Sequence, residues 1–161
     1  MAKKQTPELC YLCGHSLAPP IDHDHVPMQQ LWAPELRKKH APSQLLTIPV
    51  HKACNFAYQL DEDYFVKTIL PFVRSSYSGD VLFRKSIQEY HRGQNRLLMQ
   101  KVLREFDTRP SGLTLPANKI VKRFDGKRVS RVAWKIVRGL YFHHTGHYLP
   151  ADWTRTVEFH L

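Results

Sequence analysis

Cysteine is scarce in this sequence, with three residues among 161. An odd and small number excludes a scaffold held together by a framework of disulfides, and two of the three stand close together as Cys10-x-x-Cys13. This usage is typical of a reducing compartment and favours a metal site over a disulfide. We therefore expect an intracellular, cytoplasmic protein.

Long apolar segments are also missing. No uncharged apolar run approaches the roughly 18–20 residues that span a bilayer, although 42% of the residues are hydrophobic. The charged segment Met1–Pro7 is followed by no apolar stretch, so we expect neither a membrane protein nor a secretory leader. A chain of this length can bury a core of its own, which excludes a disordered tail.

Acidic residues are few in the second half of the chain. Residues 1–80 contain eight basic and eight acidic residues, whereas residues 81–161 contain sixteen and six, which accounts for the whole net charge of +10. Such a field indicates a polyanionic partner, and we expect DNA, in duplex form, as that partner. The expected contacts are Lys119, Lys122, Arg123, Lys127, Arg128, Arg131, Lys135 and Arg138. A solvated basic face that only aids solubility is the alternative.

The spacing of proline and of apolar residues outlines the secondary structure. Seven prolines within residues 1–50 favour short strands and loops there, with a helical turn at 33–40. Further along, apolar residues recur at intervals of three and four, which predicts helices. The expected elements are helices over 51–73, 81–106 and 129–144 and a short strand over 119–124. The basic residues of the last helix are expected to face away from its apolar stripe and toward phosphates.

Two short motifs with matching spacing predict a metal site. Cys10-x-x-Cys13 is followed by a glycine that permits a tight turn, and His51-x-x-Cys54 repeats the spacing much later in the chain. Three thiolates and one imidazole form a closed tetrahedral set, which is typical of a structural Zn²⁺ site. Either His15 or His23 could replace the imidazole of His51 as the fourth ligand.

The order of these motifs resembles the HNH endonuclease family. The first Cys pair is followed by Asp-His-Val-Pro at 24–27, and the second half-site continues directly into Asn55 at the start of an expected helix. Residues 10–65 carry the resemblance. It implies an α+β fold, with a ββα-metal core over residues 6–75 that is pinned by the Cys₃His site. A mainly helical, basic extension over residues 80–161 would pack on that core.

The resemblance also assigns roles to three residues. Asp24 and Asn55 would hold a catalytic divalent ion, Mg²⁺ or Mn²⁺, and His25 would be the general base. Phosphodiester hydrolysis requires such a set, because a histidine titrates near neutral pH and can activate water, while a divalent ion offsets the charge that develops on the phosphate. The expected function is therefore metal-dependent cleavage of DNA.

Two features depart from the family's pattern. The middle asparagine should fall near residues 43–48, where none is present, so a backbone carbonyl or Gln44 would have to orient the imidazole. In addition, Asp22-His23 repeats the Asp-His pair two residues earlier. We prefer Asp24 and His25 because Val-Pro follows them.

Other interpretations remain open at this stage. A catalytically inactive, zinc-stabilised module that binds nucleic acid is the main alternative, and a module that binds an acidic protein is a third. The acidic run Asp61-Glu62-Asp63 is expected to be a solvated helix face or a charge clamp rather than a set of metal ligands.

Overall fold

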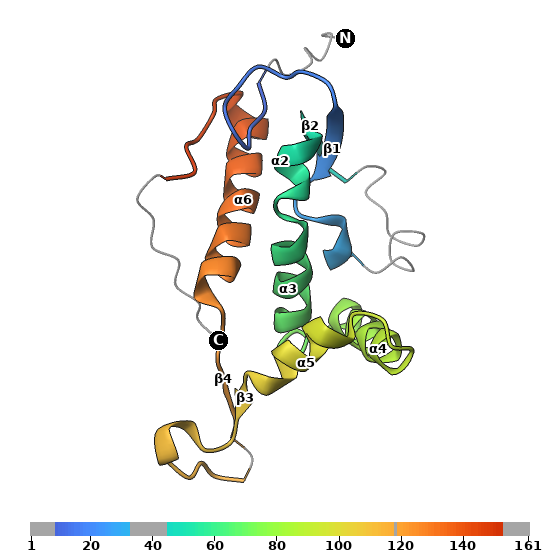
Figure 1. Cartoon of the computed structure of the whole chain (residues 1–161), viewed down its shortest axis with the longest axis vertical. Helices are drawn as coiled ribbons and strands as arrows, with labels where there is room; N and C mark the ends of the chain where they lie inside the picture. Colours follow the sequence, from blue (N-terminus) through green and yellow to red (C-terminus); the bar gives the residue numbers. More distant parts are fainter. Residues whose placement is uncertain (1–8, 33–44, 118, 153–161) are drawn as a thin grey trace.

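A β-hairpin and the helix that follows it form one end of the fold. The computed structural model describes residues 9–32, 45–117 and 119–152, which adopt a mixed α/β fold with two small sheets (Figure 1). Strands β1 (Ile21–His25) and β2 (Thr47–His51) pair antiparallel, with Ile21 opposite His51 and His25 opposite Thr47. A short 3₁₀ turn, η1 (Gln29–Leu31), follows β1. The helical turn expected at 33–40 lies outside the described residues.

The helix expected over 51–73 is divided in two. Helix α2 (Lys52–Phe56) begins directly after β2, and α3 (Gln59–Ile69) follows after a break at Ala57 and Tyr58. Helix α3 ends before Pro71, because a proline ring cannot continue a helix. The division matters because α2 directs its side chains toward the hairpin, whereas α3 packs against the C-terminal helix.

The helix expected over 81–106 is also interrupted. Helix α4 (Tyr77–His91) begins earlier than expected, because Ser76 is the N-cap and its hydroxyl accepts a hydrogen bond from the Gly79 amide. Helix α5 (Arg96–Arg104) follows a break in which Gly93 has φ of +80°. The chain reverses there because glycine adopts this left-handed conformation without steric cost.

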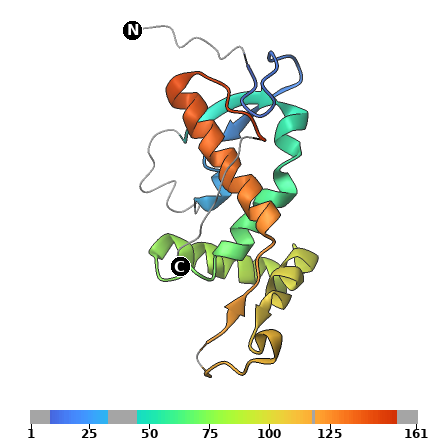
Figure 2. The same ribbon diagram turned by 90° about the vertical axis from the view of Figure 1, so that its left-hand side faces the viewer.

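A narrow ribbon projects from the far end of the molecule. Strands β3 (Phe106–Asp107) and β4 (Val121–Lys122) pair antiparallel, and the loop between them contains the 3₁₀ turn η2 (Pro110–Gly112). Figures 1 and 2 show this ribbon extending away from the helices in both views. The expected strand over 119–124 is therefore present in shortened form.

Helix α6 (Gly126–Thr145) runs beside α3 toward the hairpin end of the fold (Figures 1 and 2). The Asp125 side chain caps its start and Gly146, with φ of +71°, ends it. The helix approaches the hairpin closely at Gly139, where a Cβ atom would lie 2.7 Å from a methyl group of Val26. A larger residue at this position would push the helix away from the hairpin.

The same helix contributes to both hydrophobic clusters. Val129 and Val132 pack with residues of α3 and α5, whereas Phe142 packs with the Cys10 turn and the hairpin. Residues 126–145 thus complete a core that begins in the N-terminal half, rather than forming an appendage beside it. The boundary expected between residues 75 and 80 does not separate two cores.

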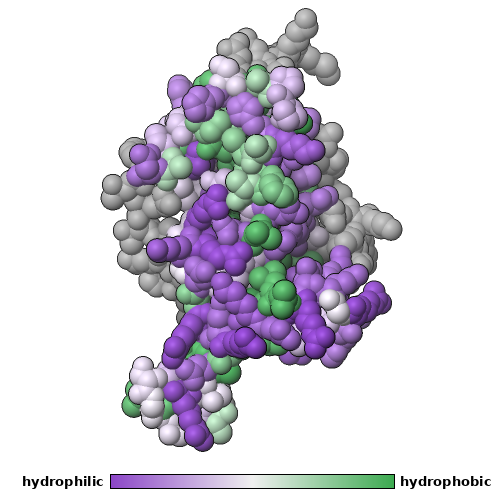
Figure 3. Space-filling model, in the orientation of Figure 1, coloured by the Kyte–Doolittle hydropathy of each residue, from purple (hydrophilic) through white to green (hydrophobic). Residues whose placement is uncertain are grey.

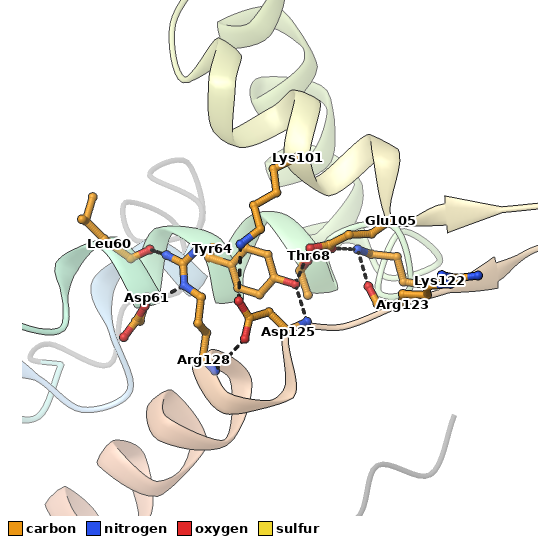
Figure 4. A network of polar contacts seen from close by, with 10 residues as sticks. All are labelled: Leu60, Asp61, Tyr64, Thr68, Lys101, Glu105, Lys122, Arg123, Asp125 and Arg128. Atoms are coloured by element: carbon orange, nitrogen blue, oxygen red, sulfur yellow. Dashed lines mark hydrogen bonds and ion pairs between the residues drawn. The ribbon is translucent and has the colours of Figure 1, made fainter.

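Polar contacts join α3, α5, β4 and the start of α6 (Figure 4). The Tyr64 hydroxyl donates to Glu105 Oε1 at 2.8 Å and accepts a hydrogen bond from the Asp125 amide at 2.8 Å. Lys122 forms an ion pair with the same glutamate. Burial raises the pKa of Tyr64 above its usual value, so the hydroxyl keeps its proton at neutral pH and can donate to the carboxylate.

The surface is mostly polar. On the face of Figure 1, apolar side chains gather in a band over α2 and α3 (Figure 3), where Phe56 and Leu60 are exposed. No helix among residues 9–32, 45–117 and 119–152 is long and apolar enough to cross a membrane.

Candidate functional site

A tight turn and a strand end bring four potential metal ligands together. In the turn, the amides of Gly14 and Cys13 both donate to the Cys10 carbonyl, at 2.7 and 3.3 Å, and Gly14 has φ of +77°. The other half comes from the end of β2 and the first turn of α2. The ligand atoms of Cys10, Cys13, His51 and Cys54 all lie within 4.8 Å of one another.

The geometry of this Cys₃His cluster fits Zn²⁺. His51 Nδ1 lies 3.4 Å from Cys13 Sγ, and His51 Nε2 lies 3.0 Å from the Ser16 carbonyl. The Ala18 amide also lies 3.2 Å from Nε2. With Nδ1 as the ligand atom, Nε2 would carry the proton and donate to the Ser16 carbonyl rather than accept from that amide. The sequence-based choice of His51 over His15 and His23 is confirmed as the imidazole of the cluster.

The thiols of this cluster lack a positive partner within the protein. Burial, together with the neighbouring Cys10 and Cys13, raises the pKa of Cys54 to about 12. Three thiols at such short range cannot all ionise without a cation between them, and a bound Zn²⁺ holds them as thiolates. The site therefore calls for an ion from outside.

An arginine of α6 holds the Cys10 turn in place. Arg138 is only 1% exposed, and its guanidinium donates to the carbonyls of Tyr11, Leu12 and Leu149 at 2.7–2.8 Å. These carbonyls have no strand partner, so the buried guanidinium satisfies the backbone of the turn. The turn is thus tied to a helix more than 120 residues later in the chain.

Tyr11 connects the Cys₃His cluster to a second polar cluster. Its backbone lies within the Cys10 turn, and its hydroxyl donates a short hydrogen bond to Asp24 Oδ2. Burial and the charge of Asp24 raise the pKa of Tyr11 above its usual value, so the hydroxyl remains a donor. The position of Asp24 therefore depends on the turn that the metal ligands form.

Three side-chain oxygens converge on one ammonium group. Lys135 Nζ lies 2.8 Å from Asp24 Oδ1 and 3.3 Å from Asn55 Oδ1, and it forms an ion pair with Glu62. Lys135 is 2% exposed and Asp24 is 4% exposed. We call Asp24, Asn55 and Glu62 the oxygen cluster. It brings together β1, α2 and α3, with α6 supplying the cation.

Asp22 orients the amide of Asn55. Asn55 Nδ2 donates to Asp22 Oδ2 at 3.0 Å, which turns Oδ1 toward Lys135. The same hydrogen bond lowers the pKa of Asp22, because it stabilises the ionised carboxylate. Asp22 thus holds a ligand in position, while Asp24, two residues further along the same face of β1, lies in the cluster itself.

The donor set of the oxygen cluster suits a divalent ion of the Mg²⁺ type. Two carboxylates and an amide oxygen are the hard ligands that such ions prefer, and all three already contact a single cation, Lys135 Nζ. Burial raises the pKa of Glu62 above its usual value, whereas Lys135 opposes the shift. An ion at this point would occupy the space that the ammonium takes.

His25 lies at the end of β1. Adjacent residues of a strand point to opposite faces, so the imidazole leaves the strand on the face opposite to Asp24. His25 is half-buried, and within the described part of the chain its ring has no hydrogen-bond partner. Gln44, one of the groups expected to orient it, lies outside the described residues. Asp24 and Asn55 therefore lie together in the structure. His25 is adjacent to Asp24 in the sequence but lies on the other face of the strand.

Three of the eight basic residues expected at a nucleic-acid surface point inward. Lys122 and Lys135 form ion pairs inside the protein and Arg138 donates to buried backbone carbonyls, so in this structure their charged groups are turned away from the surface. Lys135 and Arg138 point inward because the face of α6 that carries them is buried, together with apolar residues of the same helix. Arg128 is partly buried against Asp61. The exposed members are Lys119, Arg123, Lys127 and Arg131.

An open groove of about 520 Å³ borders the oxygen cluster. Its lining includes basic and aromatic residues. Tyr58 connects it to the oxygen cluster, because the Tyr58 ring centroid lies 4.2 Å from the Arg131 guanidinium carbon and 5.3 Å from Lys135 Nζ. The lining residues are Tyr58, Gly126, Lys127, Ser130, Arg131, Trp134 and Ala151. Positive charge next to flat rings suits a nucleic-acid strand.

The acidic run on α3 has divided roles. Asp61 pairs with Arg128 and Arg131, which is the charge clamp expected from the sequence. Asp63 accepts a hydrogen bond from Gln30. Glu62 instead belongs to the oxygen cluster, a role that the sequence analysis did not assign.

In comparisons with known proteins, the chain matches no family model, no curated protein and no solved structure. The geometry of the two clusters and the groove therefore carries the functional argument.

Proposed function

We propose that this protein is a divalent-metal-dependent nuclease with a ββα-metal core of the HNH type, which hydrolyses phosphodiester bonds in DNA. The observation that carries the proposal is the convergence of Asp24 from β1 and Asn55 from α2 on one cation, at 2.8 and 3.3 Å. A hairpin followed by a helix supplies these ligands, and the Cys₃His cluster joins the Cys10 turn to the end of β2 and the start of α2.

Each residue has a defined part in the proposed reaction. Asp24 and Asn55, with Glu62 beside them, would hold Mg²⁺ or Mn²⁺. When bound, this ion would supply positive charge against the charge that develops on the phosphate. His25 would take a proton from the attacking water on a ring nitrogen, which requires the end of β1 to turn its imidazole toward the face that carries Asp24. Asp22 would keep the Asn55 amide correctly turned. Zn²⁺ in the Cys₃His cluster would hold the scaffold together.

The groove supports DNA as the substrate. Lys127 and Arg131 line it, and so does Tyr58, whose ring centroid lies 5.3 Å from Lys135 Nζ. A strand that follows this groove would bring a phosphate toward Asp24 and Asn55. Phosphate contacts of this kind position a backbone without reading its sequence.

Nicking of supercoiled plasmid tests the proposal. Wild-type protein with Mg²⁺ or Mn²⁺ should nick, and His25→Ala should lower the rate by about 100- to 10,000-fold, the usual contribution of a general base. His23→Ala is the matched control, because it removes a histidine from the same face of β1 and should leave the rate unchanged. Zinc content, measured by elemental analysis, should be equal in all three proteins. Equal cutting by His25→Ala would remove His25 as the base.

One observation favours a second candidate, a zinc-stabilised nucleic-acid-binding module without catalysis. The ammonium of Lys135 already supplies a cation to the oxygen cluster, as it would in a scaffold that needs no catalytic ion. In the plasmid experiment this module would bind DNA and leave it uncut with every divalent ion tested.

A further inference from the structure

We propose that Lys135 is a displaceable internal cation, which occupies the divalent-ion site of the oxygen cluster and must withdraw before a metal ion binds. The proposal rests on the proposed function, because it concerns the ion that this function requires. It adds a regulatory role for a residue that the sequence places on a basic, outward helix face.

The first argument is one of space. Lys135 Nζ contacts Asp24 Oδ1, Asn55 Oδ1 and Glu62, so it lies where an ion held by the same oxygens would lie. The site is dry, with Lys135 only 2% exposed. An ammonium and a metal ion cannot both make these contacts, so their binding is mutually exclusive.

The second argument is one of charge. Asp24 and Glu62 together carry two negative charges when ionised, and a single ammonium balances one of them. A divalent ion balances both and can also accept water as a ligand. Exchange of the ammonium for the ion therefore improves the local balance of charge, while the ammonium keeps the metal-free protein folded by pairing with buried carboxylates.

The third argument concerns the position that the displaced ammonium would take. Lys135 Nζ lies 5.3 Å from the Tyr58 ring centroid, and that ring also lines the groove. Its four-carbon stem is long enough to carry the charge away from the oxygens toward this ring, over which the Arg131 guanidinium carbon also lies, 4.2 Å from the centroid. There the ammonium would meet an incoming phosphate. Metal binding would thus place a further positive charge at the DNA groove.

Direct measurement of metal binding tests the proposal without reliance on activity. Titration calorimetry with Mn²⁺ should give an affinity for Lys135→Met that is about 10- to 100-fold higher than that of the zinc-loaded wild type. Lys122→Met is the matched control, because Lys122 is a buried lysine paired with Glu105 outside the oxygen cluster. This control should bind Mn²⁺ as the wild type does. Equal or weaker Mn²⁺ binding by Lys135→Met would overturn the proposal.

A second measurement uses the wild type alone, in case Lys135→Met fails to fold. Amine acylation followed by peptide mass spectrometry should find Lys135 protected without Mn²⁺ and modified with it. Lys122, whose side chain is 3% exposed, should stay protected in both conditions. Protection of Lys135 at Mn²⁺ concentrations that saturate the protein would contradict displacement.

The two proposals can fail separately. Plasmid nicking by a wild type in which Lys135 stays protected would leave the nuclease standing and remove the displacement. Tighter Mn²⁺ binding by Lys135→Met, with no nicking by any form, would support the displacement and remove the nuclease.

Discussion

The Cys₃His cluster and the oxygen cluster are joined by Tyr11, yet each obtains positive charge in a different way. Three thiols and an imidazole face one another with no cationic side chain among them in the described part of the chain, so a metal ion could be held between them. The oxygens of Asp24, Asn55 and Glu62 surround the ammonium of Lys135, which the chain itself supplies. The first site is therefore suited to a permanent structural ion, and the second to an ion that comes and goes.

The largest expected effect is loss of the structural ion. Cys54→Ser should abolish stoichiometric zinc and unfold the hairpin with the Cys10 turn, because structural Zn²⁺ contributes about 10–16 kcal/mol of apparent binding free energy in small zinc domains. Elemental analysis and thermal unfolding would measure both losses. His15→Ala is the control, since this exposed histidine of the same turn lies outside the cluster. Full zinc content in Cys54→Ser would show that Cys54 is not a ligand.

A smaller loss of stability is expected where α6 supports the Cys10 turn. Arg138→Met should lower the free energy of unfolding by about 3 kcal/mol, because it leaves the buried carbonyls of Tyr11, Leu12 and Leu149 without a donor. Urea unfolding would measure the change. The matched variant Arg131→Met removes an exposed arginine of the same helix and should cost at most about 1 kcal/mol. Similar losses in the two variants would mean that the guanidinium does not support the turn.

The Cys₃His cluster and the buried basic residues of α6 differ in how far the sequence could predict them. Cys10, Cys13, His51 and Cys54 were predictable because each pair is local and its spacing is dictated by metal geometry. The hairpin and its helix followed from the same motifs. The interior positions of Lys135 and Arg138 were not predictable from charge, since basic side chains are seldom buried without partners.

The missed contacts had a weak signal in the sequence. Buried residues of α6 recur at intervals of three from Val129 through Val132 and Lys135 to Arg138, and then reach Phe142. Hydropathy alone does not select this pattern, because it includes two basic residues while the apolar Val137 and Leu140 are exposed. The partners of the two basic residues come from the N-terminal region, and only the fold brings these distant segments together.

A variant of Tyr11 tests the connection between the clusters. Tyr11→Phe should lower the free energy of unfolding by about 2 kcal/mol, because a hydrogen bond to a buried charged carboxylate is lost. Zinc content should not change, since the backbone of the turn is intact. Thermal unfolding and elemental analysis measure the two quantities. Tyr141→Phe, at a partly exposed position, is the control and should be nearly neutral. Zinc loss in Tyr11→Phe would show that the two clusters form one unit.

The smallest effect on stability is expected at the groove, where charge acts on a partner rather than on the fold. Lys127→Ala should change the free energy of unfolding by less than about 0.5 kcal/mol, since Lys127 is an exposed side chain. It should nevertheless weaken DNA binding and reduce the slope of log affinity against log salt by about 0.9, the value for one lost phosphate contact. Fluorescence anisotropy with a labelled duplex over a series of salt concentrations measures this slope. Lys85→Ala, which removes an exposed lysine of α4 outside the groove, should leave the slope unchanged. An equal loss in both variants would mean that DNA responds to the overall charge of the protein, and the groove would lose its role as the path to the oxygen cluster.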